Sequence, residues 1–267
     1  MSESREYPLL VVNRTSDGVL TITLDDPDRR NAMTAVMTES WDRLMRDIAA
    51  DEDVRCVVVT GAGSAFCAGG DLGWIGAEPG ARVERLRDKM LPFYRTWLSI
   101  RDLPVPTIAA VNGPAVGAGA CLALACDLRY AADTAKFAVP FTRLGIHPGM
   151  AATWLLPEVV GMANARELLY TNRAVSGAEA VALGVYNRVF PAGDFPEAVA
   201  GIAADIAATA PIAVKLTKQA LVGDGHDSFE AALRWEALAQ PITMATEDLQ
   251  EGLAAQREKR APRFTGR

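Results

Sequence analysis

Apolar residues recur with two different periodicities in the first fifty positions, and each predicts a different element. Residues Leu9 to Asn13 are mostly apolar and β-branched residues recur in Val19 to Leu24, on either side of a turn around Ser16-Asp17-Gly18, which predicts a hairpin. From Thr34 to about Ala50 the apolar positions recur at helical spacing, so we expect a helix capped by the Thr34 side chain. Its buried stripe is expected to comprise Met37, Trp41, Leu44, Met45 and Ile48.

Short apolar runs further along alternate with helical patterns. The runs at residues 55–60 and 108–111 predict buried strands, and their alternation with helices is typical of a parallel sheet in an α/β fold. A charge-rich helix is expected over residues 80–101. From Phe195 onward helical periodicity dominates, so we expect a core at residues 1–195 and a helical region at residues 196–267.

Two turns rich in small residues each follow one of these strands. One runs from Gly61 to Leu72 and the other from Asn112 to Cys121, and a helix can begin at the end of each. Small residues let backbone N–H groups approach a ligand oxygen, and a helix N-terminus adds its positive dipole end. Side by side, the turns could each donate one N–H to an oxyanion developing on a carbonyl, which indicates acyl or enolate chemistry.

At these turns the chain resembles the crotonase (enoyl-CoA hydratase/isomerase) superfamily. The resemblance implies a ββα spiral core and a C-terminal helical region, residues 196–267, that packs across subunits in a homotrimer or dimer of trimers. It also implies a lyase or isomerase of acyl-CoA thioesters, as in fatty acid metabolism. The motifs that carry it are Asp26-Pro27, Arg30-Asn31-Ala32-Met33, Phe66 to Leu72, Asn112 to Gly119, Cys126-Asp127, Leu144-Gly145-Ile146, Val160 to Leu169, Ala180 to Gly184 and Glu258-Lys259-Arg260.

The resemblance also implies roles for single residues. The backbone N–H groups of Ala68 and Ala118 would form the oxyanion hole. Lys259 would reach the nucleotide phosphate, although it could equally be a cation that favours the end of the C-terminal helix. The residues expected to contact CoA are Arg30, Ala32, Ala68, Gly69, Gly70, Asp71 and Lys259. Asp71 could instead be a capping carboxylate.

The chain departs from the family pattern at the acid–base groups. Hydratases of the family use two glutamates to position and activate water, and Cys121 and Phe141 stand at those places. Cys121 lies near a helix N-terminus, which lowers a thiol pKa, but it could be a small packed residue. His147 could transfer a proton near neutral pH or could only pack its loop. We therefore expect poor hydration activity.

Composition excludes several other classes. The 267 residues carry a net charge of −6 with no basic run, which argues against nucleic-acid binding. The N-terminus lacks a signal-peptide pattern and no apolar run is long enough for a membrane, so a soluble, cytoplasmic protein is expected. The four cysteines have no CxxC spacing and the two histidines, His147 and His226, are far apart, which predicts reduced thiols and no metal. We expect no cofactor other than the CoA of the substrate.

Two functions remain open. The first is an enzyme that acts on a CoA thioester through an oxyanion-stabilised enolate. The second is an acyl-CoA-binding protein without catalysis, which would keep the same N–H donors and CoA contacts. An α/β-hydrolase is disfavoured because the chain has no Gly-x-Ser-x-Gly motif.

Overall fold

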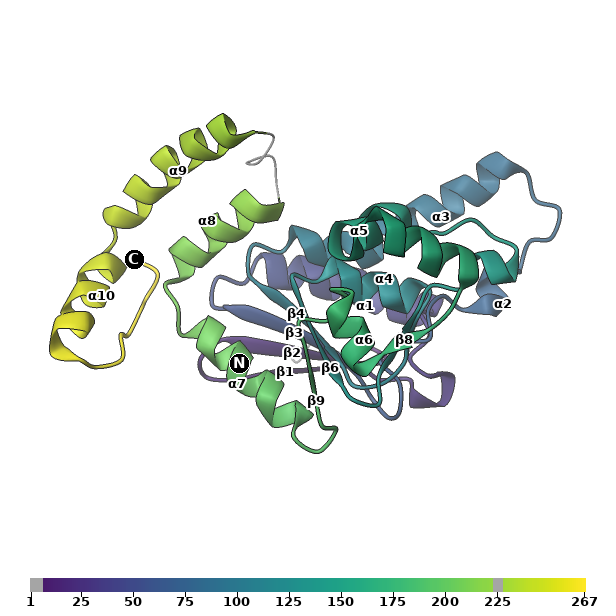
Figure 1. Ribbon diagram of the computed structural model, residues 1–267, viewed down its shortest axis with the longest axis horizontal. Helices are drawn as coiled ribbons and strands as arrows, with labels where there is room; N and C mark the ends of the chain where they lie inside the picture. The colour runs from purple at the N-terminus through teal and green to yellow at the C-terminus, as the bar shows by residue number, and fades with distance from the viewer. Residues whose placement is uncertain (1–6, 223–227) are drawn as a thin grey trace.

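The computed structural model describes residues 7–222 and 228–267. His226 lies outside the described residues, and so do residues 223–225, whose glycines predict a break between two helices. Figure 1 shows a layered α/β core, from which helices α8 to α10 extend to one side. The N-terminal hairpin lies within the core, and α2, which follows the first small-residue turn, lies at the side opposite α9 and α10.

The main sheet has six strands in the order β1-β2-β3-β4-β6-β9. The hairpin β1–β2 is antiparallel, with Leu10 paired to Leu24, and every other neighbouring pair is parallel. A second sheet has the order β5-β7-β8. The strands are β1 (Leu10–Arg14), β2 (Val19–Leu24), β3 (Cys56–Gly61), β4 (Thr107–Val111), β5 (Ala115–Val116), β6 (Leu128–Ala132), β7 (Lys136–Ala138), β8 (Val175–Ser176) and β9 (Arg188–Phe190).

Most helices lie where apolar residues at helical spacing in the sequence predicted them. Thr34 caps α1 by accepting from the Met37 N–H, and the predicted apolar stripe of α1 is buried. The helices are α1 (Ala35–Ala49), α2 (Leu72–Ile75), α3 (Val83–Leu98), α4 (Ala118–Ala125), α5 (Ala152–Thr171), α6 (Gly177–Ala182), α7 (Phe195–Ala207), α8 (Pro211–Val222), α9 (Phe229–Met244) and α10 (Glu247–Glu258). Short 3₁₀ turns are η1 (Pro27–Arg29), η2 (Ser99–Asp102) and η3 (Thr142–Leu144).

Apolar side chains cover both faces of the main sheet. The larger cluster includes Trp41 of α1 and Trp97 of α3, whose stacked rings lie 4.8 Å apart. The smaller cluster joins the opposite face to α7 through residues such as Val199 and Ala203. Helix α7 is thus part of the packed core, which continues to Ala207, beyond the boundary expected at residue 195.

Helix α8 is tied to the core by one buried ion pair. The Lys218 Nζ lies 2.8 Å from an Asp127 carboxylate oxygen and donates to the Val105 carbonyl at 2.8 Å. Asp127 also accepts from the N–H and hydroxyl of Thr107. Beyond this point the helices leave the core: α9 has no buried residue.

The last residues fold back on α10. The Arg260 guanidinium forms two hydrogen bonds with the Glu251 carboxylate, at 2.6 and 2.8 Å, and Glu251 also accepts from the Arg263 N–H. The buried Asp248 accepts from the N–H groups of Thr265 and Gly266. These bonds fix the tail against the helix that precedes it.

Candidate active site

The two small-residue turns lie side by side at the carboxyl ends of β3 and β4. The Val116 N–H donates to the Cys67 carbonyl at 2.9 Å, and the N–H groups of Phe66 and Cys67 both donate to the Pro114 carbonyl. These bonds extend the sheet pairing past the strand ends. The turns are therefore held at a fixed separation, as a pair of N–H donors requires.

The hydrogen bonds of the first turn decide which of its N–H groups can bind a ligand. The Ala68 N–H donates to the Arg30 carbonyl at 2.9 Å, and the Gly69 N–H lies 3.4 Å from the Cys67 sulfur. Within residues 7–222 and 228–267, the N–H groups of Gly70 and Ala118 have no acceptor. The structure thus corrects the expectation for Ala68, because its N–H is already paired and the free donor is that of Gly70.

Gly69 brings the two free donors close together. Its φ of +96° is a conformation that glycine adopts readily. A Cβ atom at this position would lie 3.2 Å from the Ala118 nitrogen and only 2.7 Å from the Val116 carbonyl oxygen. A side chain here would collide with the second turn, so glycine is needed for the turns to approach.

Both free donors border one cavity. Its volume is about 100 Å³, and its walls come from the two turns, α2, α3 and the segment before α5. The lining residues are Ala68, Gly69, Gly70, Leu72, Ile75, Met90, Phe93, Tyr94, Val116, Gly117, Ala118, Pro140, Phe141, Leu144, Ile146, His147, Gly149 and Met150. An apolar cavity with few polar groups is the usual form of a small-molecule site.

Asn31 organises the first turn, a role that sequence reasoning missed. Its side chain is fully buried, and its amide nitrogen donates to the carbonyls of Ala62, Ala65 and Phe66 at 2.9, 2.9 and 3.2 Å. Its amide oxygen accepts from the Asp26 N–H. No local signal could have revealed this role, because α1 and β3 separate Asn31 from the turn whose carbonyls it pairs.

His147 lies at the exposed part of the cavity wall. Its Nδ1 is 2.8 Å from the Pro148 carbonyl, which can only accept, so Nδ1 carries a hydrogen and Nε2 is the free atom of the neutral ring. Next to it, Met150 and Ala151 have φ values of 54° and 53°. Left-handed backbone at residues other than glycine is costly and clusters at functional sites.

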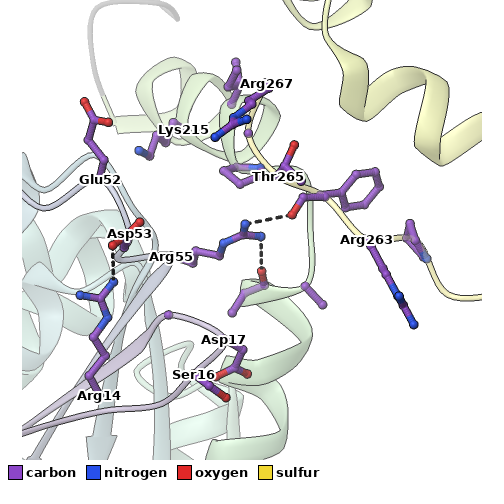
Figure 2. Close-up of a pocket in the computed structure, with 18 residues that line it drawn as sticks. Arg14, Ser16, Asp17, Glu52, Asp53, Arg55, Lys215, Arg263, Thr265 and Arg267 are labelled. Atoms are coloured by element: carbon purple, nitrogen blue, oxygen red, sulfur yellow. Dashed lines mark hydrogen bonds and ion pairs between the residues drawn. The ribbon is translucent and has the colours of Figure 1, made fainter.

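A larger hollow lies elsewhere and has a different character. It has a volume of about 980 Å³ and lies between the β1–β2 turn, the start of α8 and the tail. Figure 2 shows two of its arginines bonded to the protein itself: Arg14 forms an ion pair with Asp53, and Arg55 donates to the carbonyls of Ala207 and Phe264. These contacts join the tail to the core, and we regard the hollow as a junction between them.

Comparison with known proteins assigns the chain to a family. The model of the Enoyl-CoA hydratase/isomerase family matches residues 14–267. The chain belongs to this family, within the crotonase superfamily. The 1,2-epoxyphenylacetyl-CoA isomerase of Escherichia coli is 33% identical over 96% of this chain and 98% of its own. A candidate enoyl-CoA hydratase of Thermus thermophilus is 38% identical over 92% of this chain and 97% of its own.

A solved structure agrees with this assignment. The enoyl-CoA hydratase from Bacillus anthracis has a TM-score of 0.91 and 36% identity, covering 97% of this chain and 100% of its own. The crotonase-like fold expected from the sequence is confirmed.

At the positions of the two expected glutamates, this family member has no carboxylate. Phe141 is almost fully buried and forms part of the cavity wall, where it excludes water. Cys121 is fully buried behind the wall with its sulfur 3.8 Å from the Gly149 carbonyl, and burial raises the pKa of its thiol. The sequence led us to expect that the helix N-terminus would lower this pKa. Because burial raises it instead, Cys121 is a packed neutral thiol.

Only some of the residues expected to contact CoA line the cavity. The Ala32 N–H is paired with the Arg29 carbonyl, and Asp71 caps α2 by accepting from the Trp74 N–H at 3.0 Å. The Arg30 side chain is exposed. Lys259 is exposed at the end of α10, remote from α2 and α3 in Figure 1, and is not part of the cavity wall.

Among the described residues no single helix is both long and apolar enough to cross a membrane, and only α7 and α8 together, bent by 104°, satisfy the two criteria. The same residues contain no group of three or more His, Cys, Asp or Glu side chains that could hold a metal ion.

Proposed function

We propose that the cavity binds the acyl group of a CoA thioester, with the thioester oxygen between the N–H groups of Gly70 and Ala118. The observation that carries this proposal is that these two unpaired donors meet at one apolar cavity. Donors fixed by the fold stabilise an enolate oxygen without the reorganisation that water would need. The family's named enoyl-CoA hydratases and epoxyphenylacetyl-CoA isomerase support a thioester as the substrate class.

The reaction proposed is proton transfer at an enolate, as in an isomerase or lyase. His147 Nε2 is the titratable atom on the cavity wall that can accept or return the proton. Hydration is disfavoured, because neither Cys121 nor Phe141 can hold and deprotonate a water. General acid–base assistance is worth roughly 10²–10⁴-fold, so its loss leaves a slow hydratase at best.

The second candidate is an acyl-CoA-binding protein without catalysis. The observation that favours it is the absence of a carboxylate among the described residues that line the cavity. Both candidates predict binding of thioesters, and turnover separates them.

The test is a panel of enoyl-, hydroxyacyl-, malonyl- and aryl-CoA thioesters, measured with wild type, His147→Ala and Cys121→Ala. We expect slow crotonyl-CoA hydration, and for the best substrate a large loss in His147→Ala but not in Cys121→Ala. Rapid crotonyl-CoA hydration would contradict the proposal. No turnover of any thioester that binds would favour the second candidate.

The nucleotide end of CoA is proposed to bind at a subunit boundary. Arg30 lies near the first turn, whereas Lys259 is too remote to reach the same cavity of its own chain (Figure 1). A homotrimer or dimer of trimers would bring Lys259 of one copy to the site of another. Support comes from the exposed apolar side chains of α8 and α9, which are Leu221, Val222, Phe229, Leu233, Leu238, Ile242 and Met244.

A further inference from the structure

The cavity wall is almost entirely apolar, which makes its few polar groups informative. Among the described residues that line it, only Tyr94 and His147 have side chains with a hydrogen-bonding atom. His147 is exposed, whereas Tyr94 projects from α3 and is half-buried. Besides the two backbone donors, the Tyr94 hydroxyl is thus the polar group that an acyl group enclosed by this wall would meet.

The position of the Tyr94 hydroxyl is set by Gly149. A Cβ atom on Gly149 would lie 2.5 Å from the hydroxyl oxygen and 2.9 Å from the ring carbon that bears it. Any larger residue at position 149 would therefore displace the phenol. The end of the Tyr94 ring occupies the space in which a side chain at position 149 would stand.

Within residues 7–222 and 228–267 the Tyr94 hydroxyl makes no hydrogen bond to the protein. Burial, and to a smaller extent the neighbouring Cys121, raises the pKa of Tyr94 above its ordinary value of 10. At neutral pH the group is a protonated donor, and a ligand that shields it from water without pairing with it leaves an unsatisfied hydroxyl, which is costly.

Resting on the CoA-thioester function proposed above, we propose that the Tyr94 hydroxyl donates a hydrogen bond to an oxygen substituent on the acyl group. The site then selects acyl groups that carry oxygen on the carbons next to the thioester over plain hydrocarbon chains. An aliphatic acyl group leaves the hydroxyl unpaired in the apolar wall, and an oxygen-bearing one pairs with it. Tyr94 is accordingly a residue that determines specificity by direct contact with substrate.

The experiment compares three probes by calorimetry: butyryl-CoA, 2-hydroxybutyryl-CoA and 3-hydroxybutyryl-CoA. We expect wild type to bind at least one hydroxy probe roughly three- to tenfold more tightly than butyryl-CoA, the range of one net hydrogen bond. Tyr94→Phe should lose this preference while its affinity for butyryl-CoA stays the same or rises. Tyr170→Phe, which removes the hydroxyl of an exposed tyrosine on α5, should keep the preference.

A second variant tests the geometry with the hydroxyl retained. Gly149→Ala places a methyl group against the phenol and should also reduce the preference for the hydroxy probes. An unchanged preference in Tyr94→Phe or in Gly149→Ala, or no preference in wild type, would overturn the inference on Tyr94. If wild type binds none of the thioesters more tightly than CoA itself, the proposed function fails and this inference fails with it.

Discussion

The core helix α1 packs its apolar face inside the same chain, whereas the C-terminal helix α9 leaves its apolar side chains uncovered. Helix α1 buries Met37, Trp41 and Leu44 against the main sheet, while α9 buries no residue and exposes Phe229 and Leu238. The cavity belongs to the first region, and Lys259 to the second. One chain thus suffices to place the two free N–H groups at the cavity, whereas the proposed nucleotide site would need a second copy.

Substitutions of two tryptophans, one in each region, should differ most in how far they lower the free energy of unfolding. Trp97 is fully buried and stacks on Trp41, so Trp97→Ala should lower the free energy of unfolding by about 4 kcal/mol. Trp235 lies on the groove between α8 and α9, so Trp235→Ala should cost about 1 kcal/mol or less in the isolated chain. Urea unfolding of both variants, with sedimentation velocity for the oligomer, checks this. Equal losses of stability would show that α9 is part of the core.

Asn31→Ala should produce the next largest effect. The change removes three donated bonds and one accepted bond from buried backbone groups, and we expect a loss of about 3 kcal/mol in unfolding free energy. Because these bonds fix the first turn, turnover or thioester affinity should fall as well. Asn13→Ala, on an exposed position of β1, is the matched control and should change neither. A stable Asn31→Ala variant would mean that the turn holds its shape without this side chain.

Lys259→Ala tests whether the end of α10 contributes to CoA binding. A solvated phosphate contact is worth on the order of 1 kcal/mol, so CoA affinity should fall about fivefold. The measurement is calorimetry with CoA and with CoA lacking the ribose phosphate. If both ligands lose the same affinity, Lys259 supports the end of α10 and does not contact that phosphate.

The smallest expected effect is a pH dependence confined to the tail. The Arg260 guanidinium, together with the Arg263 N–H, lowers the pKa of Glu251 from 4.5 to about 2. A lowered pKa contributes stability that is present above pH 4.5 and is lost as the pH falls toward 2. Titration of the carboxyl by NMR should show this value, and Glu251→Gln should remove the acid-sensitive step from tail unfolding. A carboxyl that titrates near 4.5 would show that the tail does not hold this contact in solution.

The sequence predicted the framework of the molecule well, because periodicity and turn chemistry are local. The hairpin, the cap at Thr34, the short strands and both small-residue turns are where the pattern put them. The packing of α7 on the main sheet could not be seen in the sequence, because it depends on a tertiary contact.

The details of the site depend on contacts between distant segments. Nothing local in Phe66 to Gly70 reveals that Arg30 supplies the acceptor that pairs with the Ala68 N–H and leaves Gly70 free. The burial that raises the pKa of Cys121 comes from the whole fold and outweighs its place near a helix N-terminus. Tyr94 was visible in the sequence only as one of several aromatic residues, and its contact with Gly149 required the structure.

The proposed function depends on binding of the thioester oxygen by the N–H groups of Gly70 and Ala118. The most direct test replaces Ala118, the first residue of α4, where proline is tolerated and removes only a free N–H. Wild type and Ala118→Gly should bind butyryl-CoA more tightly than CoA, and Ala118→Pro should lose that difference, with turnover of the best substrate reduced about a hundredfold or more. A folded Ala118→Pro variant that keeps both the difference in affinity and full turnover would show that the Ala118 N–H does not bind the thioester oxygen.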